Sequence, residues 1–177
     1  MLAGTNYLGV SGTNAETRDG LFTADKKFRF IDITDGTSQT LLVGERGFRK
    51  GALAVIDNTE SLDNLRFGNW FSAPGQRNGS AGVVLGTREI NYGSGKSKLA
   101  WERDCPPGPY RFQPPGQIRD ATGAIREECD MFHFWSWHTG GANFLYADGS
   151  VHFLPYTVDD ILPALATRDG GEAVTPP

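Results

Sequence analysis

The sequence lacks an apolar run long enough to cross a membrane as a helix. Its longest apolar stretches, such as Leu41–Val43 and Ala52–Ile56, fall far short of the roughly 18 residues that a spanning helix needs. No signal-peptide pattern follows Met1, and no internal repeat with a period of about 20–50 residues is present. We therefore do not expect a membrane-embedded protein, a collagen, a coiled coil or a repeat protein.

Charge of one sign is also scarce, and no cluster of basic residues occurs. The chain has 17 Lys and Arg against 21 Asp and Glu, a formal net charge of −4. Proteins that bind nucleic acid usually concentrate positive charge on one surface, so nucleic acid is not an expected partner. The chain has 177 residues, of which 38% are hydrophobic, and this length predicts one domain over residues 1–177.

The first part of the sequence contains short strands separated by turns. Tyr7–Val10 and Thr40–Glu45 are predicted strands. Asp19-Gly20 and Asp35-Gly36 are typical turn dipeptides, because Asp bonds to its own backbone and Gly accepts a positive φ. With 23 Gly and 10 Pro, the chain is expected to be rich in turns and mostly β.

The strongest local signal is Asp148-Gly149 between two alternating apolar segments. Asp-Gly favours a two-residue type I′ hairpin turn, which would pair Tyr146 with Val151 and Phe144 with Phe153. These four side chains would then lie on one face of the hairpin. Because burying a large apolar side chain stabilises a fold by roughly 1.5–3 kcal/mol, we expect this face to lie in the core.

Two further segments, one near the C-terminus and one in the middle of the chain, can be assigned from their sequence. Thr157–Thr167 is predicted as a short helix, in which Pro163 must lie in the first turn. Residues 49–130 have weak periodicity and contain the proline clusters Pro106–Pro109 and Pro114–Gly116, which a sheet ladder does not accommodate. We interpret residues 49–130 as a variable insertion that meets partners.

The chain has only two cysteines, Cys105 and Cys129. Two cysteines cannot form a four-thiolate zinc site. They are either unpaired reduced thiols or one disulfide that closes an irregular loop, which would stabilise the fold by roughly 3 kcal/mol in the chain-entropy model. We favour the disulfide, and a disulfide would place the protein outside the cytosol.

No catalytic residue is predicted. The chain has three histidines, His133, His138 and His152, and no Gly-x-Ser-x-Gly motif. Asp148 lies at the far end of an extended segment from His138, so these two are not expected to form a dyad. A metal-dependent enzyme would require the histidines to converge with carboxylates, and it is the least favoured hypothesis.

No cofactor is expected, although calcium stays open as a weaker hypothesis. Calcium needs only oxygen ligands from loops. Asp32 and Asp35 are the candidate ligands, and no EF-hand spacing supports them.

The segment from His138 to Ser150 carries a family resemblance. His138, nine intervening residues and then Asp148-Gly149 resemble the H-X9-DG signature of the DUF1559 family, prepilin-type and pseudopilin-like proteins of planctomycete bacteria. The matching residues are His138, Gly140, Gly141, Asn143, Asp148, Gly149 and Ser150. Other stretches that match the same family are Asn6–Thr13, Asp19–Phe22, Asp32–Thr40, Gly44–Arg46 and Ala166–Glu172.

The resemblance implies an α+β fold, a pilin-like head in which an antiparallel sheet carries a C-terminal hairpin and a short helix. It implies a non-enzymatic assembly subunit of a type II secretion or type IV pilin-like system, with other pilin-like or secretion-system subunits as partners. The protein would be extracytoplasmic, in the periplasm or at the cell surface. Anchoring in the inner membrane would come from an N-terminal helix that is absent from this chain.

A second interpretation is an extracytoplasmic module that binds glycans or peptides. Aromatic rings provide stacking surfaces for such ligands. The four candidate stacking residues are Trp70, Trp101, Trp135 and Trp137. This interpretation predicts that at least two of these side chains are exposed around one groove.

Overall fold

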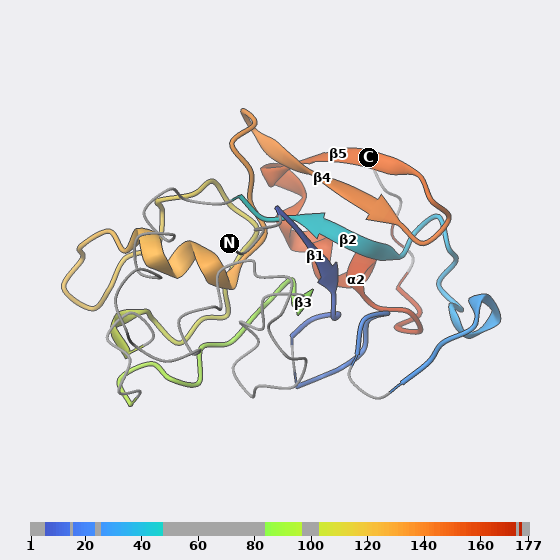
Figure 1. Ribbon diagram of the computed structural model, residues 1–177, viewed down its shortest axis with the longest axis horizontal. Coiled ribbons are helices and arrows are strands. Elements are labelled where there is room, and N and C mark those ends of the chain that lie inside the picture. Colours follow the sequence, from blue (N-terminus) through green and yellow to red (C-terminus); the bar gives the residue numbers. More distant parts are fainter. Residues whose placement is uncertain are drawn as a thin grey trace, which may run out of the picture.

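The computed structural model describes residues 6–14, 16–23, 26–47, 84–96, 103–172 and 174, and Trp70 and Trp101 lie outside them. The described residues form an α+β fold, as predicted (Figure 1). The strands are β1 (Tyr7–Val10), β2 (Leu41–Glu45), β3 (Val84–Leu85), β4 (Gly141–Tyr146) and β5 (Val151–Pro155). The helical segments are the 3-10 helices η1 (Phe30–Asp32), η5 (Glu127–Phe132) and η6 (Tyr156–Ile161) and the α-helix α2 (Leu162–Ala166).

The five strands form one mixed sheet in the order β3-β1-β2-β4-β5. The pairs β1–β2, β2–β4 and β4–β5 are antiparallel, as expected. The pair β1–β3 is parallel, so the sheet is not antiparallel throughout. The predicted strand Tyr7–Val10 is confirmed at its bounds. β5 lies at one edge of the sheet, with β4 as its neighbour.

The hairpin between β4 and β5 forms where the sequence predicts it, but its turn is different. Tyr146 N donates to Ser150 O (2.9 Å) and Gly149 N donates to Tyr146 O (3.0 Å), which makes a three-residue loop. Gly149 has a φ of +90° while Asp148 has no positive φ. This is a type I turn followed by a left-handed glycine, whereas type I′ would require positive φ at both central residues.

The longer loop moves the register of β5 by one residue, and the predicted face assignment is therefore wrong for β5. Phe144 pairs with His152, and Leu145 pairs with Val151. A one-residue shift turns every side chain of a strand to the other face. Phe144 is only 1% exposed, whereas Val151 is 64% and Phe153 is 47% exposed.

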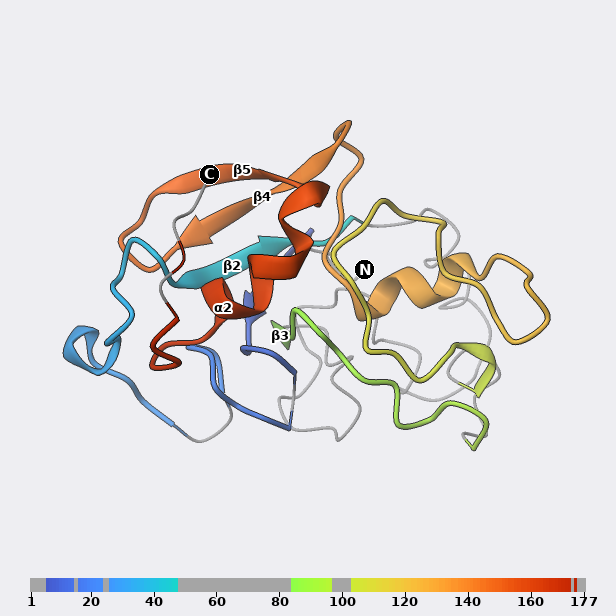
Figure 2. The same cartoon turned by 180° about the vertical axis from the view of Figure 1, so that it is seen from behind.

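Short helices cover the inner face of the sheet, as Figure 2 shows from behind. Leu162 and Leu165 of α2 belong to the same apolar cluster as Phe144 and Leu154. Pro163 lies in the first turn of α2, as predicted, where its missing N–H removes no helical hydrogen bond. None of the helices among the described residues has the length and apolar character that crossing a bilayer requires.

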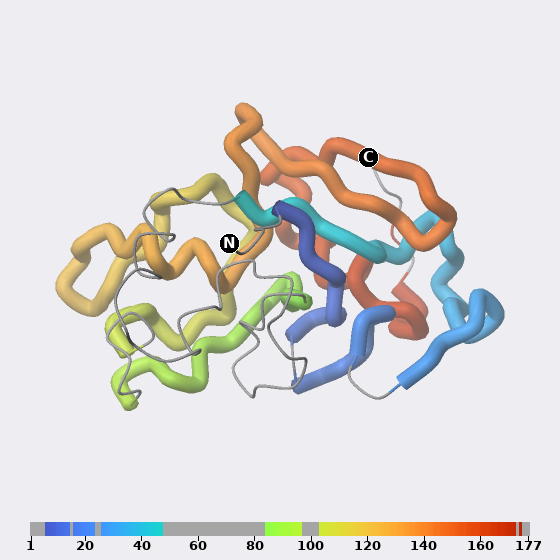
Figure 3. The backbone as a smooth tube through the Cα atoms, viewed as in Figure 1, coloured from blue at the N-terminus to red at the C-terminus, as the bar shows by residue number. Residues whose placement is uncertain are grey.

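A second part of the molecule lies beside the sheet and has little regular structure (Figure 3). We call its described residues, 86–96 and 103–133, the loop region, and we call the strands β1, β2, β4 and β5 with η6 and α2 the sheet region. The loop region has its own buried cluster, which consists of Cys105, Tyr110, Ile118, Cys129, Met131 and Phe132. The predicted disulfide between Cys105 and Cys129 is confirmed, with Cα atoms 5.6 Å apart, and it joins two segments of this region.

Candidate functional site

The residues of the signature begin in a tight loop before β4. Ser136 Oγ donates to Gly141 O (2.6 Å), and His138 N donates to Ser136 Oγ (2.9 Å). Gly140 has a φ of +88°. A Cβ on Gly141 would lie 2.1 Å from the carbonyl oxygen of Leu154, so only glycine fits this close approach of β5. The loop is thereby folded back on β4 and holds His138 at the end of the sheet.

Glu45, the last residue of β2, lies beside this loop with a side chain that is 10% exposed. Its Oε2 accepts hydrogen bonds from the backbone N of Asn143 (3.0 Å) and from Asn143 Nδ2 (3.1 Å). Its Oε1 lies 3.6 Å from Nε2 of His138. Glu45, His138 and Asn143 therefore form one group, which we call the Glu45 cluster.

The Glu45 cluster joins two family motifs that are far apart in the sequence. Glu45 belongs to Gly44–Arg46, whereas His138 and Asn143 belong to the signature. Glu45 and Asn143 are 98 positions apart. Both motifs are recognisable in the sequence, but their contact is not. Thr40–Glu45 is recognisable as a short strand with an apolar interior, and no local pattern indicates which strand lies beside it.

Aromatic side chains lie within and beside the loop that holds His138. Trp137 is 63% exposed, and its ring packs edge-on against Trp135 at 5.1 Å. The ring of His138 lies 6.4 Å from that of Phe153. Trp135 itself is 2% exposed and donates from its indole nitrogen to Asp130 O (2.9 Å). Of these two tryptophans, Trp137 alone presents a ring to solvent.

The other end of the signature forms the hairpin turn. Asp148 accepts hydrogen bonds from the backbone N (2.8 Å) and the hydroxyl (2.7 Å) of Ser150. These bonds hold the pKa of the Asp148 carboxyl below its ordinary value. Asp148 lies at the opposite end of β4 from His138. The two ends of the signature therefore have separate structural partners, a turn and the Glu45 cluster.

The C-terminal family motif packs against the N-terminal ones. Backbone N atoms of Gly170 (2.8 Å) and Gly171 (2.9 Å) donate to the carboxylate of Asp35. The guanidinium of Arg168 donates to Gly20 O (3.0 Å) and lies 4.4 Å above the ring of Phe28. These contacts join the C-terminal family motif to the N-terminal ones, so the motifs that contain Asp35 and Arg168 have structural partners.

The two candidate calcium ligands each have other partners. Asp32 forms an ion pair with Arg29 (2.9 Å), and the hydrogen bond from that side chain lowers the pKa of Asp32. Asp35 accepts the two glycine N–H groups described above. Among the residues that the structure describes, no group of three or more His, Cys, Asp or Glu side chains could hold a metal ion.

The histidines lie in three separate environments. Buried His133 faces Asp130 with Nε2 (3.1 Å) and the carbonyl oxygen of Phe134 with Nδ1 (3.0 Å). His152 is exposed on β5, and its Nε2 lies 3.1 Å from Ser150 Oγ. The third, His138, is in the Glu45 cluster. The structure therefore does not bring the three rings together.

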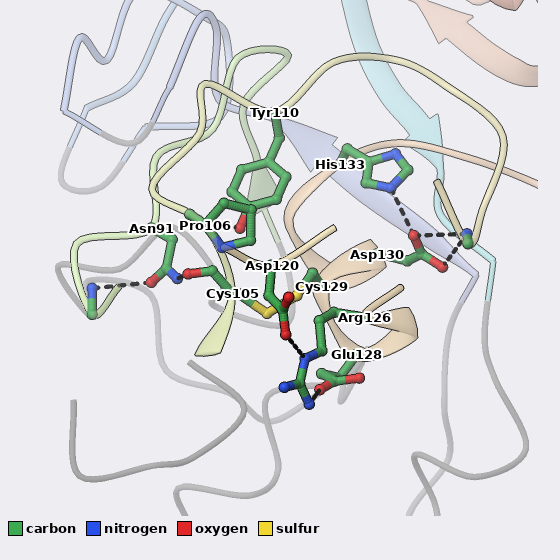
Figure 4. Close-up of a disulfide and its surroundings, with 12 residues drawn as sticks. Asn91, Cys105, Pro106, Tyr110, Asp120, Arg126, Glu128, Cys129, Asp130 and His133 are labelled. Carbon is green, nitrogen blue, oxygen red and sulfur yellow. Dashed lines mark hydrogen bonds and ion pairs between the residues drawn. A yellow bond between two sulfur atoms is a disulfide. The ribbon is translucent and has the colours of Figure 1, made fainter. Parts of the chain in front are cut away.

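Figure 4 shows how polar side chains surround the disulfide of the loop region. Asn91 Nδ2 donates to Cys105 O (3.1 Å), and Arg126 forms an ion pair with Asp120 (2.7 Å). Arg46, which follows Glu45, is 3% exposed and donates to Met131 O (3.1 Å). Burial lowers the pKa of Arg46 to about 10. No pattern in the sequence indicates this buried cation, which connects the end of β2 to η5.

Comparison with known proteins gives one match. The model of the family SBP_bac_10, described as "Protein of unknown function (DUF1559)", matches residues 3–160. No curated protein and no solved structure matches the chain. The match covers nearly the whole described fold, including the Glu45 cluster and the hairpin.

Proposed function

Since this chain belongs to the SBP_bac_10 family (DUF1559), we propose that it is a non-enzymatic, extracytoplasmic head domain that acts by assembling with other protein subunits. The subunits would be those of a type II secretion or type IV pilin-like system. The family match supports only membership, and the assembly role is inferred from the surface of the molecule.

One observation carries the proposal, namely the exposed apolar side chains of the edge strand β5 and of the loop before β4. Trp137, Val151 and Phe153 are 63%, 64% and 47% exposed. Phe153 lies beside the Glu45 cluster, where its ring is 6.4 Å from that of His138, whereas Val151 lies nearer the hairpin turn, opposite Leu145. Exposed apolar surface rimmed by polar groups is typical of protein contacts, and buried tryptophans dominate the affinity of many interfaces.

Two further features favour this function. The disulfide between Cys105 and Cys129 is typical of proteins that fold outside the cytosol. Many titratable side chains of the described residues are engaged in structural contacts, as Asp35 is with Gly170 and Gly171. Such contacts fit a rigid head better than a catalytic centre.

The assembly role is tested with Trp137→Ser in the native host. Complexes that contain the protein are separated by native electrophoresis after mild detergent extraction. We expect Trp137→Ser to move the protein to smaller species while its melting temperature stays unchanged. Ile125→Ser is the matched control because Ile125 is also exposed (49%) but lies in the loop region. Unchanged complexes in Trp137→Ser would contradict the proposal.

A second candidate function is glycan or peptide binding at the Glu45 cluster. It is favoured by the exposed ring of Trp137 next to His138, whose Nε2 faces Glu45. Intrinsic tryptophan fluorescence makes a direct test, with Trp137→Phe as the control that removes the contribution of Trp137 and leaves that of the other three tryptophans. Quenching by an oligosaccharide or peptide that Glu45→Gln abolishes would support binding, and no change over a panel of both classes would exclude it.

A further inference from the structure

β5 leaves one of its two edges without a strand partner in the described fold, because it ends the strand order next to β4. In an antiparallel pair, the backbone groups of alternate residues point toward the neighbour and away from it. Ser150 and Tyr156 bond toward the β4 side, through Tyr146 N and Gly140 O. The backbone N–H and C=O groups of Val151 and Phe153 therefore point away from β4.

The open edge carries few of the features that usually prevent strands from pairing. Exposed edges are generally protected by charged side chains, by proline or by a bulge. β5 has the sequence Val-His-Phe-Leu-Pro, with no Lys, Arg, Asp or Glu. Its proline, Pro155, is the last residue, and the side chains of Val151 and Phe153 are exposed.

We propose that a second copy of this chain pairs with β5 in antiparallel orientation, with His152 on the two-fold axis. This inference rests on the proposed function, for which it names one partner. In this register Val151 of each copy lies opposite Phe153 of the other. The outward N–H and C=O groups of both residues then bond across the interface on both copies.

The backbone favours this register over its neighbours. A shift toward the end of β5 places Pro155 opposite Val151, and Pro155 has no N–H to donate. A shift toward the start places the turn residue Gly149 opposite Phe153, where the left-handed backbone cannot continue a ladder. Only the register centred on His152 uses both outward residues of each strand.

Charge and symmetry favour a second copy as the occupant. β5 has no Lys, Arg, Asp or Glu, and its one ionisable side chain, His152, meets its own counterpart on the axis, so two neutral imidazoles cause no repulsion there. The apolar side chains of Val151 and Phe153 would cover each other on the same face of the joined sheet. A two-fold contact of this kind is closed, so it leaves no open edge for a third copy.

The register is tested by disulfide cross-linking of His152→Cys in the full chain. On the two-fold axis this residue faces its own counterpart in a non-hydrogen-bonded pair, with Cα atoms about 4.5 Å apart, which lies within the range of a disulfide. Both native cysteines are already joined, so they do not compete. We expect a covalent dimer on mild oxidation.

Ser150→Cys is the matched control for the cross-link. In the proposed register the two Ser150 residues are separated by four residue steps, or about 13 Å, which no disulfide spans. The proposal is supported if His152→Cys cross-links and Ser150→Cys does not. Equal cross-linking of both variants, or of neither, would overturn it.

Val151→Lys tests the same interface without a covalent bond. A lysine on the edge should weaken the dimer by about tenfold or more, as measured by sedimentation equilibrium, whereas Ile125→Lys should leave it unchanged. A wild-type chain that is monomeric at all concentrations overturns self-pairing. If native complexes still depend on Trp137 in that case, the assembly function stands and β5 binds no second copy.

Discussion

The sheet region and the loop region are stabilised by different means. The sheet region has backbone ladders on four strands and a cluster of Leu, Val and aromatic side chains. The loop region has a small cluster around one disulfide, and it buries polar groups such as Asp130 and His133. Regular hydrogen bonding makes a covalent link unnecessary in the first region, whereas the second must limit its unfolded-state entropy with a cross-link.

The two regions meet at a small polar and aromatic boundary. Asp159, from η6, accepts a hydrogen bond from Phe112 N (2.7 Å) and pairs with Arg88 (2.9 Å). The ring of Phe112 lies 5.4 Å from that of Phe144. A loop-region residue, Phe112, thus completes the core of the sheet region.

The largest expected effect is that of Phe144→Ala in the sheet region. Phe144 is 1% exposed and contacts Phe134 and Phe112, and the cavity should lower the free energy of unfolding by about 3–5 kcal/mol. Urea denaturation measures the change. Phe153→Ala, on the other face of the same hairpin, should cost less than about 1 kcal/mol. Equal losses from both would contradict the observed register.

Removing the disulfide should have the next largest effect on stability, and it should affect the loop region more than the sheet region. Cys105→Ser with Cys129→Ser releases a loop with a sequence separation of 24, which should lower the free energy of unfolding by about 3 kcal/mol. Hydrogen exchange should increase in residues 103–133 and stay slow in β2 and β4. Uniform acceleration over both regions would show that the loop region does not open on its own.

Sequence patterns predicted most of the sheet region because its signals are local. Tyr7–Val10 is a short, largely apolar run before a turn, Pro163 limits α2, and Asp148-Gly149 marks a reversal. The predicted register of β5 was wrong because the turn is held by groups that are distant in the sequence. Ala147 N and Asp148 N donate to Thr40 O and Thr37 O (2.9 and 3.1 Å), and no pattern within the hairpin reveals these acceptors.

The loop region was less predictable because its contacts have no period. The disulfide was expected from two cysteines, but the burial of Arg46 and His133 depends on partners that only the fold supplies. The Glu45 cluster could be predicted only in part. Its histidine was identified from the signature, whereas the carboxylate of Glu45 meets Asn143 across 98 positions.

The boundary between the regions is tested by Asp159→Ala. The variant leaves Phe112 N without its acceptor and Arg88 without its ion pair, which should lower the free energy of unfolding by about 2 kcal/mol. Asp160→Ala is the control, because Asp160 pairs with Arg111 at 86% side-chain exposure and should cost at most about 0.5 kcal/mol. If the two variants are equal in urea denaturation, Asp159 does not connect the regions.

The smallest effects are expected for two aspartates that each hold a turn, Asp120 in the loop region and Asp148 in the hairpin of the sheet region. Asp120 accepts from the hydroxyl and the backbone N of Thr122 (2.6 and 2.8 Å), and Asp148 accepts in the same way from Ser150. The pKa of Asp120 lies well below its ordinary value of 3.8, first because of the Thr122 hydroxyl and then because of Arg126. The pKa of Asp148 is lowered first by the hydrogen bonds from Ser150 and to a smaller extent by the charge of His152.

A carboxyl group whose pKa is lowered in the folded state stabilises the fold at pH values above its ordinary pKa. This stabilisation is lost as the pH falls through the folded-state pKa. Asp120→Asn should therefore reduce the free energy of unfolding near pH 7, and its difference from wild type should shrink toward about pH 2. Asp148→Asn should follow the same course with a smaller difference, because Asp148 has the weaker attraction of His152 where Asp120 has the hydrogen bond from Arg126. Urea denaturation at both pH values measures this order. A difference for Asp120→Asn that stays constant with pH would mean that the carboxylate charge contributes nothing to the loop region, and that its turn depends on geometry alone.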